Sequence, residues 1–204
     1  MMGADGSETF DYVIVGSGAA GSIVAARLSE DSGASVCVLE AGGADWHPYL
    51  QLPAGFIKVI LNPERAGQFS SEPSARTAGR RIPLPQGKTL GGSTSINGLV
   101  YNRGQREDFD GWAARGNPGW TYDEVLPYFM RSETFVDGGD AALRGQSGRL
   151  KGTLPQWPHP ICEAFVQGAQ ELGMPLNPDY NGASQQGVGY FQRTIHQGWR
   201  VSTS

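Results

Sequence analysis

The hydrophobic pattern of the first forty residues predicts a strand, a helix and a second strand. Residues 10–16 (FDYVIVG) and 35–39 (SVCVL) are short apolar runs, which are typical of strands buried on both faces. Between them, residues 22–30 (SIVAARLSE) place Ile23, Ala26 and Arg27 along one helical stripe. A strand, a helix and a strand in this order form a βαβ unit, so we expect a parallel sheet that is covered on both faces.

The regular alternation of apolar strand and helix patterns ends after Gly43. Residues 44–86 contain six prolines, which argues against a long helix there. Further along the chain, glycine and proline recur too closely for a second core of the same kind, and no further run of buried strands is expected after residue 110. We expect a short helix at residues 56–61 and helical structure throughout residues 105–135, including an amphipathic helix at residues 122–129 with Thr121 as the N-cap. A last helix is expected at residues 160–173, ending at Gly173.

Composition and charge narrow the class of protein. The chain has 204 residues, 39% of them hydrophobic, which is enough for one domain or a domain and a half. Its net charge is -4 and its 16 basic residues are scattered, so we expect neither nucleic acid nor an anionic membrane surface as a partner.

No apolar run approaches the roughly 20 residues of a membrane span, and the first residues (MMGADGSETF) do not resemble a secretory signal. The two cysteines, Cys37 and Cys162, are too few for a disulfide framework or a metal site. A soluble, cytoplasmic protein is therefore expected.

A glycine-rich loop follows the first predicted strand and opens the first predicted helix. It reads GSGAAG and matches the dinucleotide-binding pattern G-x-G-x-x-G. In this setting Gly16 makes the tight turn, Gly18 admits a pyrophosphate close to the backbone, and Gly21 allows close packing of helix and strand. Glu40 ends the second strand, 22 residues after Gly18, where a carboxylate can bind ribose hydroxyls and repel a 2′-phosphate. The expected cofactor contacts of this unit are Gly16, Ser17, Gly18, Ala19, Ala20, Gly21, Glu40 and Ala41. The unit alone does not distinguish FAD from NAD, and a plain βαβ unit with a solvated glutamate is the alternative.

A second glycine-rich segment is more specific. Residues 87–110 (GKTLGGSTSINGLVYNRGQREDFD) resemble the signature of the glucose–methanol–choline (GMC) family of FAD-dependent oxidoreductases. The resemblance extends to residues 11–30, 38–43, 112–129 and 181–204. The matching positions of the signature are Gly91, Gly92, Ser93, Thr94, Ile96, Asn97, Tyr101, Gly104 and Asp110.

The resemblance implies a fold, a cofactor and its contacts. The fold would be α/β, with a Rossmann-like FAD-binding βαβ unit and parts of a second, substrate-binding domain, incomplete in this chain. We divide the chain into residues 1–45, which form the FAD-binding unit, residues 46–135, which hold the FAD-contacting loops and helices, and residues 136–204, which begin the substrate-binding domain. The signature segment is expected to run along FAD from pyrophosphate to flavin. Its expected contacts are Thr89, Gly91, Gly92, Asn97, Gly98, Leu99 and Val100.

One signature position predicts how FAD is held. Some members of the family carry a histidine just before the signature asparagine and attach FAD to it covalently. This chain has Ile96 there, and its side chain offers no nucleophilic atom. We therefore expect FAD to be bound non-covalently.

The resemblance also implies a reaction. A base takes the hydroxyl proton of an alcohol while a hydride passes from the alcohol carbon to flavin N5, and the electrons go to oxygen or another acceptor. The family places a catalytic histidine, with a second histidine or an asparagine, near its C-terminus. His47, His159 and His196 do not match that position, so no catalytic residue is assigned in this chain. We expect the chain to be the N-terminal part of a larger enzyme that folds stably only with its C-terminal complement.

Three other functions are alternatives. A hydroxynitrile lyase of the same family would keep FAD but perform no net oxidation. A truncated FAD-binding fragment would bind the cofactor without turnover. An NAD-dependent Rossmann enzyme is disfavoured because it does not explain residues 87–110.

Overall fold

The computed structural model describes residues 8–204, which form two compact units. The first unit comprises residues 8–98 together with Gly198–Ser204, and the second comprises Leu99–Gln197. The boundaries predicted at residues 45 and 135 do not coincide with this division. Compactness does not assign a function to either segment, so the three functional parts stay a prediction.

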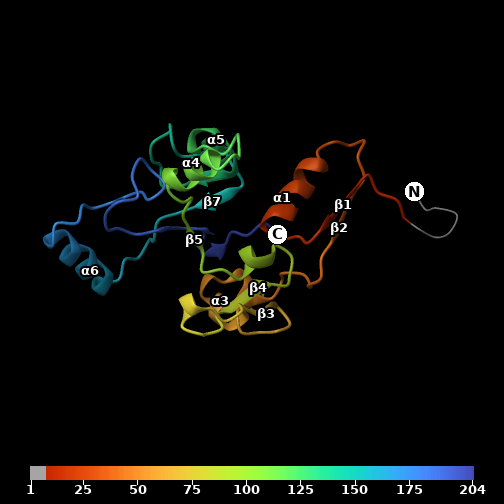
Figure 1. Ribbon diagram of the computed structural model, residues 1–204, viewed down its shortest axis with the longest axis horizontal. Coiled ribbons are helices and arrows are strands. Elements are labelled where there is room, and N and C mark those ends of the chain that lie inside the picture. Colours follow the sequence, from red (N-terminus) through yellow and green to blue (C-terminus); the bar gives the residue numbers. More distant parts are fainter. Residues whose placement is uncertain (1–7) are drawn as a thin grey trace. The chain divides into compact units, whose positions relative to one another are not determined.

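The predicted βαβ unit is confirmed. Strand β1 (Tyr12–Val15) pairs in parallel with strand β2 (Val36–Leu39), with Tyr12 opposite Val36. Helix α1 (Ala19–Leu28) connects the two strands and packs against both (Figure 1). The helix begins at Ala19, three residues before the predicted range 22–30, because the small residues of the glycine loop already belong to its first turn.

The burial predicted for this sheet is wrong. The side chains of Val13, Val15 and Leu39 are 56%, 85% and 53% exposed. Only two strands form this sheet within residues 8–204, so no neighbouring strand and no second layer of helices covers these side chains. An apolar run identifies a strand that is suited to burial, whereas burial itself depends on the elements that surround it.

The rest of the first unit is built from short elements. Its small core consists of Leu50, Val59, Ala66 and Ile96. The helix expected at residues 56–61 is a single turn at Phe56–Val59, and a 3₁₀ turn at Gly92–Ser95 lies within the signature segment. The remaining elements are α2 (Pro48–Gln51), 3₁₀ turns at Pro53–Gly55 and Ala75–Thr77, β10 (Trp199–Arg200), and β3 (Ala66–Ser70), which pairs antiparallel with β4 (Pro83–Gly87).

The second unit contains the longer predicted helices. Thr121 caps its helix as predicted, because its side chain accepts a hydrogen bond from the Glu124 backbone N–H while the Glu124 carboxylate accepts one from the Thr121 N–H. Gly173 follows the last helix at a φ of +89°, which suits the predicted C-terminal stop. The helices are α4 (Arg106–Ala114), α5 (Tyr122–Ser132) and α6 (Pro160–Glu171). With 12 residues, α6 is the longest helix of the described chain, and none of these helices has the length and hydropathy to cross a membrane.

The strands of the second unit correct the expectation of helix throughout residues 105–135. Residues 133–135 form strand β6 (Glu133–Phe135), which runs parallel to β7 (Leu150–Gly152). The helical pattern ends at Ser132 because Glu133 is fully buried among charged partners rather than on a helix surface. The other strands are β5 (Val100–Tyr101), which pairs antiparallel with β8 (Gln192–Arg193), and β9 (Ile195–His196).

A buried ionic network holds the second unit together. The Glu133 carboxylate accepts hydrogen bonds from Arg103 and, at 2.8 Å, from Nε of Arg144. Arg144 also donates to Oδ1 of Asp179 at 2.6 Å, and its guanidinium lies 3.8 Å from the centre of the Phe135 ring. Glu133 and Arg144 are 0% and 1% exposed. Two positive and two negative charges thus neutralise each other, and Arg103, Arg144 and Glu133 are buried while the Asp179 side chain is 19% exposed.

Replacing Glu133 by glutamine should lower the free energy of unfolding by about 3–5 kcal/mol, because Arg103 and Arg144 would lose their shared counter-ion in a buried site. Urea denaturation of the full-length protein, followed by tryptophan fluorescence, measures this loss. Glu72→Gln is the matched control, because it removes the exposed Glu72–Arg81 pair and should cost at most about 1 kcal/mol. Equal losses in the two variants would contradict the assignment of Glu133 as the centre of the network.

Candidate cofactor-binding site

The phosphate loop follows β1 as a sharp turn in which Gly16 and Gly21 are required by the backbone conformation and by close packing. Gly16 has a φ of +89° and its N–H donates to the Leu39 carbonyl at 2.7 Å. A Cβ added to Gly21 would lie 1.9 Å from the Gly16 carbonyl oxygen, so only glycine allows α1 to pack so closely against β1. Gly18 is the N-cap of α1, and no side chain caps this helix. The N–H groups of the first helical turn are therefore not occupied by a capping side chain.

Glu40 is bonded to the phosphate loop. Its Oε2 accepts hydrogen bonds from the backbone N–H and the hydroxyl of Ser17 at 2.8 and 2.7 Å, and its Oε1 accepts one from the Gly42 N–H at 2.8 Å. Partial burial raises the pKa of Glu40, but these hydrogen bonds outweigh it, and the net pKa is lowered below the ordinary value of 4.5. Sequence reasoning proposed only a cofactor contact for this carboxylate. Its contacts in the structure show that it also fixes the loop to the end of β2.

The second glycine-rich segment lies directly against the phosphate loop. The Gly91 N–H donates to the Ser17 carbonyl at 2.9 Å. A Cβ added to Gly92 would lie 2.7 Å from Cα of Gly18, and Gly92 has a φ of +54°. Backbone atoms of two motifs that are 74 residues apart in the sequence are therefore in contact. Gly92, the second glycine of the adjacent pair, is needed for this contact.

The hydroxyl groups of the signature segment bind the protein itself. Thr89 is fully buried, and its Oγ1 donates to the Gly43 carbonyl at 2.8 Å. Ser93 Oγ accepts from the Gly87 N–H at 3.0 Å, and Thr94 Oγ1 donates to the Gly91 carbonyl at 2.6 Å. These side chains stabilise the shape of the segment.

The remaining predicted cofactor contacts differ in their exposure and in the unit to which they belong. Ala19, Ala20, Ala41, Asn97 and Gly98 are exposed in the first unit. Leu99 and Val100 belong to the second unit, where Leu99 is buried at a φ of +67° and Val100 is 57% exposed at the start of β5. Ile96 is 3% exposed and belongs to the core.

Sequence reasoning missed the residues that bind the signature segment from the end of the chain. Arg200 is buried and its guanidinium donates hydrogen bonds to Thr94 and Asn97. The Thr203 N–H donates to Thr94 Oγ1 at 3.1 Å. Residues 181–204 did resemble the family, but a single arginine without a neighbouring motif gave no signal of a buried position.

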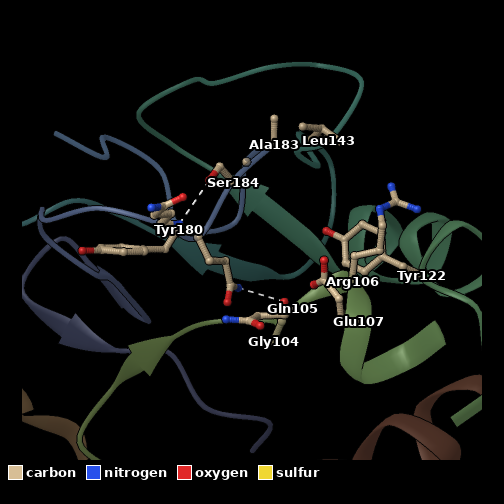
Figure 2. A pocket seen from close by; sticks show the side chains of 12 residues that line it. Gly104, Gln105, Arg106, Glu107, Tyr122, Leu143, Tyr180, Ala183 and Ser184 are labelled. Atoms are coloured by element: carbon tan, nitrogen blue, oxygen red, sulfur yellow. Dashed lines mark hydrogen bonds between the residues drawn. The ribbon is translucent and has the colours of Figure 1, made fainter. Parts of the chain in front are cut away.

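The second unit contains a separate polar cavity of about 410 Å³ (Figure 2). The guanidinium of Arg106 lies 4.6 Å from the centre of the Tyr122 ring on one wall. Gln185 and Gly104 also line the cavity, and Gln185 Nε2 donates to the Gly104 carbonyl at 2.8 Å. No residue predicted to contact the cofactor lines this cavity.

Two of the three histidines have a structural role. Nδ1 of His47 and Nδ1 of His159 each accept a hydrogen bond from the backbone at 3.2 Å, and so cap α2 and α6. Among residues 8–204, no group of three or more His, Cys, Asp and Glu side chains could hold a metal ion.

Comparisons with known sequences give a consistent family. The family model described as GMC oxidoreductase matches residues 10–204. The chain is 43% identical to an oxygen-dependent choline dehydrogenase of Rhizobium etli (strain CIAT 652) and 44% identical to one of Vibrio vulnificus (strain YJ016). These matches cover 95% and 96% of this chain but only 35% of each relative.

Solved structures agree with the sequence matches. A pyridoxine 4-oxidase from Mesorbium loti has a TM-score of 0.88 and 34% identity, covering 96% of this chain and 38% of its own. An FAD-dependent oxidoreductase from Chaetomium thermophilum has a TM-score of 0.83 and 31% identity, covering 96% and 35%. The chain thus spans about a third of the length of its relatives. The resemblance found in residues 87–110 is confirmed, and the chain belongs to the GMC oxidoreductase family, whose members are FAD-dependent flavoproteins.

Proposed function

We propose that the first unit binds FAD non-covalently and that the full-length enzyme containing this chain oxidises an alcohol. One observation carries the cofactor assignment, namely the contact between the backbones of Gly18 and Gly92. It places two glycine segments together, beside the uncapped first turn of α1. Exposed backbone and N–H groups at a helix N-terminus are the features that bind a pyrophosphate.

Individual residues support this fit. Gly16 and Gly18 are partly exposed and leave the backbone accessible to phosphate oxygens, since neither carries a Cβ. Glu40 has the chemistry to accept hydrogen bonds from ribose hydroxyls with the acceptor positions that Ser17 and Gly42 do not use. Thr89, whose hydroxyl is bonded to Gly43, would contribute to the site through its backbone and its packing rather than its hydroxyl.

The reaction is inferred from the relatives. Bound FAD would accept the hydride that an alcohol loses on oxidation. The named relatives are a choline dehydrogenase and a pyridoxine oxidase, and a formate oxidase also matches with a TM-score of 0.84. No observation favours a hydroxynitrile lyase. We assign no catalytic base to this chain, and propose that the base belongs to the remaining two thirds of the enzyme.

The exposed apolar strands support a complement of this kind. Val13 and Val15 of β1 and Leu39 of β2 are more than half exposed, and their burial requires further strands or helices. The C-terminal remainder of the same enzyme is the partner that we propose. A small-molecule alcohol, an electron acceptor such as oxygen, and a cytoplasmic location remain predictions of the sequence.

A spectroscopic experiment tests the proposed reaction. The purified full-length enzyme should show flavin absorbance that bleaches when a substrate alcohol is added without oxygen. Choline, pyridoxine and a benzylic alcohol are the first alcohols to test. Precipitation of the same sample with acid should release the flavin into the supernatant, because Ile96 offers no atom for a covalent bond. A colourless enzyme would refute the cofactor, and flavin that stays with the precipitate would refute non-covalent binding.

Gly92→Ala should raise the dissociation constant of FAD by roughly tenfold or more, because its new Cβ would collide with Gly18 and alanine is strained at a positive φ. Flavin fluorescence during a titration of the apoenzyme with FAD measures this constant. Gly111→Ala is the matched control, because Gly111 lies in α4 with no atom within 4 Å of the added Cβ. Wild-type affinity in Gly92→Ala would show that the contact does not shape the site.

Glu40 should make a pH-dependent contribution to stability. Because the pKa of Glu40 is lowered on folding, its stabilisation is complete above the ordinary value of 4.5 and is lost as the pH falls toward the folded value. The difference in thermal midpoint between wild type and Glu40→Gln should therefore be constant above about pH 5 and shrink at lower pH. Glu64→Gln, which changes an exposed glutamate of the same unit, is the matched control. A pH-independent difference for Glu40→Gln would contradict the linkage.

A further inference from the structure

Arg200 is a buried cation in the first unit. Its side chain comes from β10, and the residue is 6% exposed. The guanidinium donates four hydrogen bonds, one from Nε to the Leu50 carbonyl at 2.9 Å and three to the signature segment. Those three go to the Thr94 carbonyl at 3.0 Å, to Oδ1 of Asn97 at 2.7 Å and to the Asn97 carbonyl at 3.0 Å.

The charge of Arg200 has no counter-ion among residues 8–204. All six salt bridges found in the described chain involve other residues. Burial lowers the pKa of Arg200 to about 10, which still leaves the guanidinium protonated at neutral pH. The buried arginines of the second unit differ from Arg200 because both have a carboxylate counter-ion. Arg103 and Arg144 each form a salt bridge with Glu133.

The hydrogen bonds of Arg200 also orient Asn97. A guanidinium can only donate, so the Asn97 amide must turn its oxygen toward Arg200. The NH₂ group, which can only donate, therefore faces away from Arg200. The Thr94 and Asn97 carbonyls are held by the same fork, which fixes the backbone on both sides of Ile96.

We propose that Arg200 is a positioning residue of the cofactor site, which orients Asn97 and supplies an uncompensated positive charge to the flavin end of the signature segment. This inference rests on the proposed function, because it is the proposed binding of FAD that makes Asn97 a cofactor contact. The partner of the charge is the flavin ring in its reduced form.

The charge balance of the reaction gives the consequence. An alcohol that is oxidised loses a hydride to the flavin and a proton to the base. The hydride brings two electrons and one proton to the ring, so the ring gains one negative charge. A fixed cation nearby stabilises that charge more than it stabilises the neutral oxidised ring, and therefore raises the reduction potential.

The test is the two-electron reduction potential of the flavin in the full-length holoenzyme, measured by anaerobic reductive titration against a reference dye. Arg200→Gln keeps a donor group but removes the charge. It should lower the equilibrium constant for reduction about tenfold, which corresponds to about 30 mV. Arg200→Lys keeps the charge but not the fork, and should retain the wild-type potential while binding FAD more weakly. Arg76→Gln is the matched control, because Arg76 is an exposed arginine of the same unit, and the potential of this variant should equal that of the wild type.

Two further outcomes are distinguishable. If Arg200→Gln does not fold, Asn97→Asp serves instead, because it places a carboxylate on Arg200 with little change of shape and should also lower the potential. Equal potentials in wild type and in every folded variant that removes or neutralises the charge would overturn the role of Arg200 while leaving FAD binding intact. A wild-type enzyme without flavin would instead overturn the proposed function.

Discussion

Close contact between backbones is the constraint on which the first unit depends. A Cβ on Gly92 would lie 2.7 Å from Gly18, one on Gly42 would lie 2.1 Å from the Lys88 carbonyl carbon, and one on Gly87 would lie 2.2 Å from Gly92. Each of these contacts is possible only for glycine. Glycine enrichment here therefore serves dense packing of irregular backbone as much as flexibility, and the packed backbone presents the features expected of a dinucleotide site.

Internal hydrogen bonds then hold the packed loops in one shape. Ser17 and Glu40 join the phosphate loop to the end of β2, and Thr89 joins the signature segment to Gly43. These groups are ordered when the protein folds. A cofactor that binds to loops already in place does not have to order them, so less of its interaction energy is lost to conformational entropy.

Local signals were predicted well from the sequence, and contacts between distant segments were not. The βαβ unit, the Thr121 cap and the stop at Gly173 each depend on residues within a few positions of one another. The exposure of Val15 and the strand at Glu133–Phe135 depend on which elements surround them, which no local pattern contains.

In the candidate site, too, the local motifs were predictable from the sequence and the contacts between distant residues were not. The glycine motifs were visible because their spacing and context are characteristic of dinucleotide binding. The bond from Ser17 to Glu40 and the position of Arg200 were not, because they join residues 23 and more than 100 positions apart. A carboxylate predicted as a cofactor contact thus proved to have a second role within the protein.

The two buried arginine arrangements differ in a way that bears on function. In the second unit, Arg103 and Arg144 are neutralised by Glu133 and Asp179, as expected where a charge serves only to hold strands and loops together. In the first unit, carbonyl and amide oxygens surround Arg200 and no carboxylate neutralises it. Dipoles satisfy the hydrogen bonds of a guanidinium but leave its net charge in place, and a buried net charge is costly unless an anion compensates it. The proposed anion is the reduced flavin, which carries its negative charge only after hydride transfer. The positive charge of Arg200 would therefore stabilise the product of that step more than the oxidised cofactor, and so lower the free energy of the reaction at that step.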